Sequence, residues 1–292
     1  MPELPEVETV RRLIAPHCID QRIAGVDLRD FAGVLETDLP FDPVTAMIGA
    51  SILSVHRRGK YLLFPLDSGL WLTIHLRMTG RLIVKDAAAD PIRFEHIAIH
   101  LGSGEDLRFG DQRRFGRVTL LDKDRIDALL DRLGPEPFDR KLTAHVLHER
   151  LKRRPGSIKG SLLDQGLIAG LGNIYVDEAL WRSRIHPLTA SHSLDETSLR
   201  RLLRAIRYVL KLSIQNQGTT FSSFENPYGE RGNNASYLKV YGRSGERAIC
   251  DRCGGPLERT VVAGRGTVVC PHCQLLPVAT IPSRQQFADP RE

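Results

Sequence analysis

The sequence predicts an α+β protein, in which an N-terminal helix and a β-sandwich are followed by a helical domain that carries a four-cysteine hairpin. Three observations predict this class. Short strand-like runs broken by Gly, Asp and Pro fill residues 23–121, helical periodicity dominates 141–214, and four of the five cysteines cluster near the C-terminus. A length of 292 residues favours two domains.

Charge and hydropathy limit the classes of function. The chain has 41 Lys and Arg against 35 Asp and Glu, a net charge of +6, and its basic residues lie in several clusters. This pattern favours nucleic acid as a partner over a membrane surface. No apolar run is long enough to span a membrane, and no apolar stretch of a secretory signal follows the N-terminus, so a cytoplasmic protein is expected. The absence of heptads predicts a monomer.

The N-terminal segment combines a helical pattern with reactive groups. Apolar residues repeat with helical spacing over 4–14, at Leu4, Val7, Val10, Leu13 and Ile14. If Met1 is removed, the secondary amine of Pro2 can attack an aldehyde carbon and form an iminium, and a terminal amine titrates near pH ~8. Glu3 and Glu6 follow within one turn. A proline-started helix with acids at its positive end has the same pattern, so these residues alone leave both interpretations open.

The β-rich region predicts an antiparallel sandwich from its apolar runs at 61–64, 70–74, 97–99 and 118–121. Lys60 begins one run, where a lysine is commonly a solvated charge but can also act on phosphate or as an acid or base. Met78 precedes a Gly turn and would by itself be assigned to the core. Together with Arg113 and Phe115, however, Met78 could insert into a duplex and fill the space left by an extruded base.

The second half is predicted to be helical after a Gly- and Pro-rich linker at 133–137. Helical periodicity covers about 141–153, 172–184 and 195–214, and the polar residues 215–237 predict a loop. Asn173 is suited to capping a helix, and a helix N-terminus also binds phosphate. The basic run over 150–159, which includes Arg154 and Lys159, would support phosphate binding or form a solvated basic face.

The clustered cysteines form two C-x2-C pairs separated by sixteen residues, a spacing typical of a tetrahedral zinc site: Cys250, Cys253, Cys270 and Cys273. Two disulfides are the alternative, which fits poorly with a chain lacking a secretion signal. The segment between the pairs is long enough for a β-hairpin, and its tip carries Arg265, which could contact a DNA backbone. Cys18 is expected to be a small buried hydrophobe.

Together these segments resemble the bacterial formamidopyrimidine-DNA glycosylase family, whose members are bifunctional DNA glycosylases and AP lyases for oxidised purines. The matching segments run in family order to about residue 274: Pro2–Glu6, Arg58–Leu62, His75–Gly80, Arg113–Gly116, Gly170–Tyr175, Gly218–Thr220, Val240–Arg243 and the four clustered cysteines.

The resemblance implies an N-terminal β-sandwich, a helix–two-turn–helix domain and a zinc finger. The implied limits are a catalytic domain over 1–133, a linker over 134–140, a helical domain over 141–237, a zinc finger over 243–275 and a tail of unknown role over 276–292. The implied cofactor is one structural Zn²⁺, with no catalytic metal or organic cofactor. The implied partner is double-stranded DNA with oxidised bases, bound by a monomer in the bacterial cytoplasm with the nucleoid.

The resemblance also implies catalytic roles. Pro2 would be the nucleophile at the sugar C1′, Glu3 would move protons at the opening sugar ring, and Glu6 would support them. Lys60 would assist β-elimination, and Arg265 would hold the phosphate during δ-elimination.

Further implied roles concern DNA contact. Met78, Arg113 and Phe115 would fill the space left by the extruded base, and Arg154 and Asn173 would hold the DNA backbone. The loop over 218–237 would cover the everted base.

Three departures from the family pattern and two alternatives remain. Phe94 stands where some members have a DNA-contacting histidine, the tail after Cys273 is longer than usual, and the covering loop is an uncommon version. One alternative is an endonuclease VIII-type glycosylase for oxidised pyrimidines, against which Leu4 and the Arg113/Phe115 pair argue. The other is a non-catalytic zinc-finger DNA-binding protein, which would leave the set of Pro2 and Glu3 with Lys60 unexplained.

Overall fold

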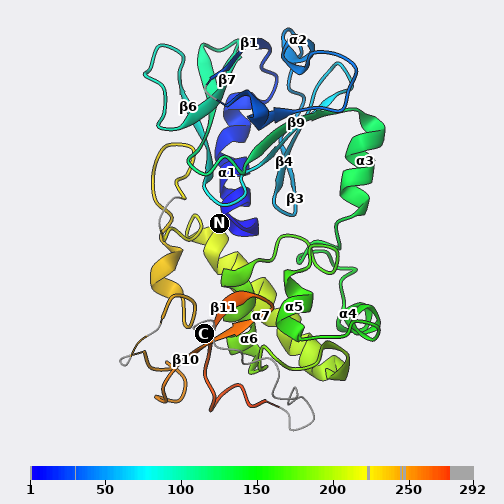
Figure 1. Cartoon of the computed structure of the whole chain (residues 1–292), viewed down its shortest axis with the longest axis vertical. Helices are drawn as coiled ribbons and strands as arrows, with labels where there is room; N and C mark the ends of the chain where they lie inside the picture. The colour runs from blue at the N-terminus through cyan, green and yellow to red at the C-terminus, as the bar shows by residue number, and fades with distance from the viewer. Residues whose placement is uncertain (1, 30, 222–223, 244, 246–247, 277–292) are drawn as a thin grey trace, which may run out of the picture. The chain divides into compact units, whose positions relative to one another are not determined.

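The computed structural model describes residues 2–29, 31–221, 224–243, 245 and 248–276 (Figure 1). It is an α+β protein, as predicted, and it divides into two compact units. The first, called the sandwich unit, comprises Met1–Glu136 and Leu210–Tyr237, and the second, called the zinc unit, comprises Pro137–Val209 and Leu238–Glu292. Across the described residues, no helix is both long enough and apolar enough to cross a membrane.

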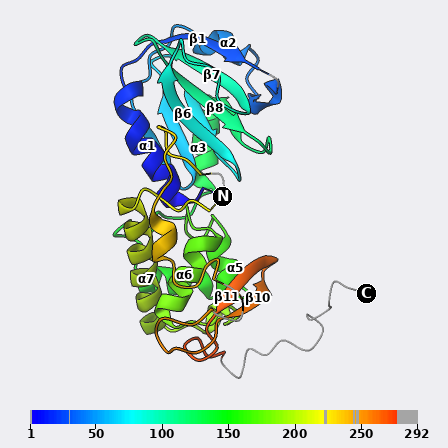
Figure 2. The same ribbon diagram turned by 90° about the vertical axis from the view of Figure 1, so that its left-hand side faces the viewer.

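Two sheets form the sandwich unit, and Figure 2 shows the strands of the first, β1, β7, β8 and β6. The four-stranded sheet has the order β1-β7-β8-β6, with bounds Ile23–Leu28, Glu95–Leu101, Glu105–Asp111 and Gly80–Asp86. The five-stranded sheet has the order β2-β9-β5-β4-β3, with bounds Leu35–Glu36, Arg117–Leu121, Trp71–His75, Tyr61–Pro65 and His56–Arg58. All pairings are antiparallel except that of β2 with β9. The predicted runs at 61–64, 97–99 and 118–121 lie within these strands, and the fourth run is shifted by one residue.

Helix α1 (Leu4–Cys18) closes one side of the sandwich, because it contacts β3 and β4 of one sheet and β6 of the other. Its predicted apolar face enters the core, where Val7, Val10 and Ile14 are buried together with Cys18. The helix extends four residues beyond the predicted end at Ile14 and contains Pro16 near its last turn. Cys18 is buried as expected, and burial raises the pKa of its thiol to about 12.

Shorter helices in the sandwich unit were not predicted. They are α2 (Pro43–Met47) and α3 (Lys123–Asp131), and each begins at an aspartate whose side chain accepts a backbone N–H of the first turn, Asp42 and Asp122 respectively. Only Ile126 of α3 is buried. A single buried position leaves no helical period for sequence analysis to detect.

The zinc unit contains the predicted helices and hairpin. Helices α4 (Ala144–Leu151), α6 (Asn173–Ser183) and α7 (Glu196–Gln215) correspond to the three predicted helical segments, and a short α5 (Ile158–Leu163) lies between α4 and α6. Strands β10 (Glu258–Val262) and β11 (Arg265–Val269) form the antiparallel hairpin, and β11 packs against α6 (Figure 1). The last turns of α7, from Leu210, group with the sandwich unit.

Residues 210–237 join the sandwich unit, which differs from the 141–237 domain expected from the sequence. The reason is a set of contacts to the first 120 residues. Phe224 enters the sandwich core, Arg81 forms an ion pair of 2.8 Å with Glu225, and the backbone N–H of Val84 donates to the carbonyl of Pro227 at 3.1 Å. Residues 222–223 of this loop, and 277–292 of the predicted tail, lie outside the described residues.

Candidate active site and nucleic-acid contacts

The residues after Pro2 are fixed by a capping box at the start of α1. Glu3 is the N-cap, and its backbone N–H donates to Oε2 of Glu6 at 2.8 Å while the Glu3 side chain accepts from the backbone of Glu6. Pro2, Glu3 and Glu6 are all buried. The helix interpretation and the reactive-terminus interpretation are therefore compatible, since the cap holds the backbone next to the Pro2 nitrogen in one conformation.

Glu6 also connects this N-terminus to the loop over 218–237. Its Oε1 accepts the backbone N–H of Thr219 at 2.8 Å, and the adjacent Gly218 has a positive φ of 86°. A Cβ at position 218 would lie 3.1 Å from Cγ of Glu6, so glycine permits this close approach. One carboxylate thus joins the capping box that follows Pro2 to the predicted covering loop, a link between segments more than two hundred residues apart.

Lys60 lies in a two-residue turn between β3 and β4, beside Gly59, whose φ is 56°. Its side chain is 7% exposed. The turn is held by Glu136, whose Oε1 accepts the N–H of Gly59 at 2.7 Å and whose carboxylate pairs with Arg57 at 2.8 Å and Arg58 at 3.2 Å. Glu136 falls in the predicted linker, and its role was not predicted from the sequence. Because α1 contacts β3 and β4, the N-terminal helix and the Lys60 turn belong to one rigid part of the sandwich unit.

His75 is a neutral hydrogen-bond donor in this region. Burial, together with the charges of Arg77 and Lys60, lowers the pKa of His75 to about 3. The backbone N–H of Arg77 donates to Nδ1 of His75 at 3.0 Å, which leaves the proton of the neutral ring on Nε2. The sequence motif contained His75, but no role was predicted for it.

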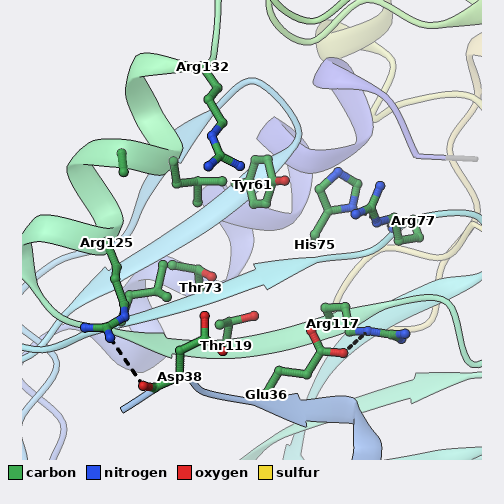
Figure 3. Close-up of a pocket in the computed structure, with 13 residues that line it drawn as sticks. Glu36, Asp38, Tyr61, Thr73, His75, Arg77, Arg117, Thr119, Arg125 and Arg132 are labelled. Atoms are coloured by element: carbon green, nitrogen blue, oxygen red, sulfur yellow. Dashed lines mark hydrogen bonds and ion pairs between the residues drawn. The ribbon is translucent and has the colours of Figure 1, made fainter.

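His75 lines a pocket of about 430 Å³ on the five-stranded sheet (Figure 3). The Tyr61 and His75 rings meet edge to face with centroids 4.6 Å apart. Four arginines line the pocket: Arg77, Arg117, Arg125 and Arg132. Arg117 pairs with Glu36 of the same pocket at 2.5 Å, whereas Arg125 pairs with Asp122 and donates to the carbonyl of Asp38 at 3.3 Å. The pocket therefore combines a neutral donor with four cations and two acids, Glu36 and Asp38, and its arginines are suited to an anionic group.

The two loops predicted to insert into a duplex are organised by Asp111, which is 1% exposed. Its Oδ2 accepts the N–H groups of Phe115 at 2.9 Å and Gly116 at 2.7 Å. Its Oδ1 accepts the N–H of Arg113 at 3.1 Å and the hydroxyl of Thr79, the residue after Met78. One buried carboxylate therefore fixes both loops, and sequence reasoning did not identify it.

The insertion residues themselves face outward to different degrees. Phe115 is 47% exposed, Arg113 is exposed and Met78 is half-buried. The guanidinium of Arg113 lies 4.7 Å from the centroid of the Phe115 ring, a cation–π contact that keeps the two side chains together. The prediction that Met78 belongs to these loops and not to the core fits this partial exposure.

Phe94 lies in the turn immediately before β7, in a left-handed backbone conformation with φ 58°. It is 40% exposed and carries the guanidinium of Arg93 4.7 Å from its ring centroid. The neighbouring His96 donates from Nε2 to the carbonyl of Asp111 at 2.8 Å, because a carbonyl oxygen can only accept. His96 is therefore a support for the insertion loop.

In the zinc unit, two residues that are predicted to contact DNA bond to other groups of the protein. Arg154 is half-buried and pairs with Asp164. Gly172, not Asn173, is the N-cap of α6, and the Asn173 amide Nδ2 donates to the carbonyl of Gly266 at 2.9 Å. The N-cap interpretation of Asn173 is therefore wrong, because its side chain spans to the zinc hairpin.

Lys159 corrects a second expectation from the sequence. The sequence predicts that Lys159 belongs to a solvated or phosphate-binding basic run, but its side chain is fully buried. Its Nζ pairs with Asp177 of α6 at 2.6 Å. A charge run in sequence gives no information on which of its members is enclosed.

The clustered cysteines fit a tetrahedral zinc site. Their Sγ atoms all lie within 4.8 Å of one another, with Cys250 to Cys273 at 3.9 Å and Cys253 to Cys270 at 3.5 Å. Four ligands at ~2.3 Å around Zn²⁺ would place the sulfurs ~3.8 Å apart. All five cysteines are free thiols, so the disulfide alternative is not supported.

The zinc site is attached to α6 through Trp181. Its indole N–H donates to Sγ of Cys250 at 3.3 Å, and the guanidinium of Arg252 lies 4.2 Å from its ring centroid. Such a bond stabilises a thiolate ligand. The hairpin projects from this base with a two-residue turn, Ala263–Gly264, and the exposed Arg265 is the first residue of β11.

Comparison with known protein families gives three matches. Residues 1–118 match the formamidopyrimidine-DNA glycosylase N-terminal domain, residues 133–225 match the formamidopyrimidine-DNA glycosylase H2TH domain, and residues 250–275 match the zinc finger found in FPG and IleRS. The predicted order of domains and the four-cysteine zinc finger are thereby confirmed.

Individual relatives agree over nearly the whole chain. A formamidopyrimidine-DNA glycosylase of Chloroflexus aggregans is 46% identical over 94% of this chain and 99% of its own, and that of Herpetosiphon aurantiacus is 43% identical over 94% and 100%. The crystal structure of MutM (FPG) from Thermus thermophilus has a TM-score of 0.83 at 41% identity, covering 94% of this chain and 100% of that one. A Lactococcus lactis Fpg variant in complex with Fapy-dG-containing DNA has a TM-score of 0.84 at 35% identity, with the same coverage. The chain belongs to the formamidopyrimidine-DNA glycosylase family.

Proposed function

We propose that this protein is a DNA glycosylase that excises oxidised purines, such as 8-oxoguanine and formamidopyrimidines, and then cleaves the strand at the resulting abasic site by β,δ-elimination. The observation that carries the proposal is the N-terminus of a chain of this family, where Pro2 precedes Glu3 in a buried capping box held by Glu6. The proposed substrate is duplex DNA containing the lesion, acted on by a monomer. We also propose that it acts on chromosomal DNA in the bacterial cytoplasm, at the nucleoid.

The chemistry begins when Met1 is removed and the Pro2 nitrogen attacks C1′ of the lesion sugar. The glycosidic bond breaks, and the base leaves with a proton. The sugar ring then opens as the C1′–O4′ bond breaks and Glu3 protonates O4′, which leaves an iminium between C1′ and Pro2. Because the capping box fixes Glu3 next to Pro2, the acid and the nucleophile meet the same sugar.

Elimination follows from the iminium. The positive nitrogen acidifies C2′, so a base can remove a C2′ proton and the 3′ C–O bond breaks. Lys60 assists this β-elimination from the turn held by Glu136. In δ-elimination a C4′ proton is removed and the C5′–O bond breaks, while Arg265 holds the 5′ phosphate that leaves. Hydrolysis of the iminium then releases the sugar fragment as an aldehyde and regenerates the Pro2 amine.

Base extrusion must precede this chemistry and costs a few kcal/mol. We propose that Met78, Arg113 and Phe115 repay this cost by filling the vacated space, and that Asp111 fixes their loops for insertion. Arg154 and Asn173 contact the DNA backbone. The loop over 218–237 covers the everted base and is tied to the N-terminus through Thr219 and Glu6.

Zinc is structural in this proposal. The four cysteine thiolates would complete its coordination shell and leave no open position for water or substrate. When bound, it fixes the base of the hairpin that presents Arg265.

Borohydride trapping tests the proposal. The protein is mixed with duplex DNA containing 8-oxoguanine opposite cytosine and reduced, and a covalent adduct is expected. A form that retains Met1, in which the Pro2 nitrogen is an amide and cannot attack, should lower the yield at least a hundredfold. Lys60→Met should slow strand cleavage, whereas Lys85→Met, at an exposed lysine of β6, serves as the matched control and should change nothing. An undiminished adduct in the form that retains Met1 would refute the assignment of the nucleophile, and faster release of thymine glycol than of 8-oxoguanine would refute the substrate class.

A further inference from the structure

Lys159 of α5 has an environment that the proposed chemistry does not explain. Its side chain is 0% exposed, and its ammonium donates to Oδ1 of Asp177 at 2.6 Å, to Oγ1 of Thr267 at 2.7 Å and to the carbonyl of Gly266 at 3.3 Å. Asp177 and Thr267 are also buried. Burial of an ion pair is commonly no more stabilising than apolar residues of the same volume. A role in geometry therefore accounts for this pair better than a role in stability.

Burial of this pair disfavours the ionised form of Asp177. Burial raises the pKa of Asp177 to about 6, although the neighbouring Lys159 charge acts to lower it. The fold thus retains a carboxylate that burial disfavours.

The hydrogen bonds of Lys159 converge on the backbone of Arg265. The Thr267 hydroxyl accepts from Lys159 and donates to the carbonyl of Arg265 at 3.0 Å. The next carbonyl, that of Gly266, accepts from both Lys159 and the Asn173 amide, the latter at 2.9 Å. The Gly266 carbonyl is therefore fixed directly by groups from α5 and α6, and the Arg265 carbonyl is fixed by the Thr267 hydroxyl that accepts from Lys159. The Arg265 side chain itself is exposed.

The opposite side of this end of the hairpin faces solvent. The turn consists of Ala263 and Gly264, both exposed, and both have positive φ values, 51° and 68°. On the partner strand, Val261 is 69% exposed. On the β11 side, the hydrogen bonds of Lys159, Asn173 and Thr267 thus attach the backbone at Arg265 and Gly266 to α5 and α6.

We propose that Lys159 and Asp177 are positioning residues that fix the backbone of Arg265 through Thr267 and Gly266. This inference rests on the proposed function, in which Arg265 holds a phosphate during δ-elimination. Asp177 holds the Lys159 ammonium, the ammonium orients the Thr267 hydroxyl, and the hydroxyl fixes the Arg265 carbonyl. The guanidinium then reaches the phosphate from one backbone conformation instead of many.

Product analysis on DNA with a preformed abasic site tests this relay. In Lys159→Met and Thr267→Val, the rate of the δ step should fall about tenfold, so that the β-elimination product accumulates, while borohydride trapping stays within twofold of wild type. Thr267→Ser keeps the hydroxyl and should restore the wild-type product ratio. Leu162→Ala, at a buried position of α5 outside the relay, is the control for simple destabilisation and should leave the ratio unchanged.

Two results would overturn the inference: an unchanged ratio in Lys159→Met and Thr267→Val, or an equal change in Leu162→Ala. Amide hydrogen exchange over 263–267 gives a readout that needs no catalysis. It should accelerate at least tenfold in Lys159→Met and not in Leu162→Ala, and equal exchange in both would also overturn the inference. If wild-type protein itself gives no adduct and no cleavage, the proposed function fails, and the exchange measurement still decides whether the relay fixes the hairpin.

Discussion

Replacing Asp111 with asparagine should separate base extrusion from chemistry. The substitution preserves shape but replaces one oxygen with an NH₂ group. Whichever oxygen is lost, two hydrogen bonds disappear, and the new donor faces two existing donors. These are the N–H groups of Phe115 and Gly116 on one side, or the N–H of Arg113 and the Thr79 hydroxyl on the other.

The magnitude follows from the number of lost bonds. Hydrogen bonds to a charged acceptor contribute about 1.5–3 kcal/mol each. Two lost bonds, reduced by hydration of the loops at the surface, give a local destabilisation of about 3 kcal/mol. A free-energy difference of 1.4 kcal/mol corresponds to a factor of ten. If ordering the two loops costs about 3 kcal/mol more in the variant, lesion excision should slow about a hundredfold.

Single-turnover kinetics on two substrates checks this prediction. Excision of 8-oxoguanine from duplex should slow about a hundredfold in Asp111→Asn, while cleavage of a preformed abasic site, where no base has to be extruded, should slow less than about fivefold. The matched control is Asp86→Asn, because Asp86 is exposed and accepts one N–H, that of Ala88 at 2.8 Å. Equal slowing on both substrates, or no effect on either, would refute the assignment of Asp111 to the insertion loops.

Three further predictions follow from other parts of the molecule. Burial opposes ionisation of Glu8, but hydrogen bonds from Arg11 and Arg12 outweigh it and lower the pKa of Glu8 to about 2, below its ordinary 4.5. Its contribution to the free energy of unfolding, roughly 2–3 kcal/mol, is therefore present above pH 4.5 and lost as the pH falls toward 2, so that chemical denaturation of Glu8→Gln should converge with wild type at low pH. Removal of zinc by a chelator should abolish δ-elimination and lower DNA affinity, and added Zn²⁺ should restore both; full activity in metal-free protein would contradict the structural role of the finger. His75→Gln should weaken DNA binding without moving either limb of the pH–rate profile between about pH 5 and 9, because His75 with a pKa of about 3 stays neutral throughout this range.

Sequence analysis predicted the zinc site, because the spacing of the two cysteine pairs is typical of a four-cysteine site, and the family match confirms it. Pro2 and Glu3 are predicted from their position at the N-terminus together with the family resemblance. Arg265 is predicted from its place at the tip of the hairpin together with the same resemblance, and the roles of these three residues stay predictions.

The supporting residues could not be predicted in the same way. Glu136 holds the N–H of Gly59 from 77 positions away, and Asp111 reaches Thr79 across 32 positions. Each is an ordinary acid in sequence and acquires a role only when the chain folds. Lys159 shows the same limit. Its charge predicts an exposed side chain, but the side chain is buried and paired with Asp177.

The most direct test of the account is mass spectrometry of the borohydride-trapped complex. After nuclease and protease digestion, the reduced sugar adduct is expected on the N-terminal peptide, at the nitrogen of Pro2 in protein that has lost Met1. An adduct on the peptide containing Lys60, or an adduct formed equally by protein that keeps Met1, would contradict the central claim that the terminal proline is the nucleophile.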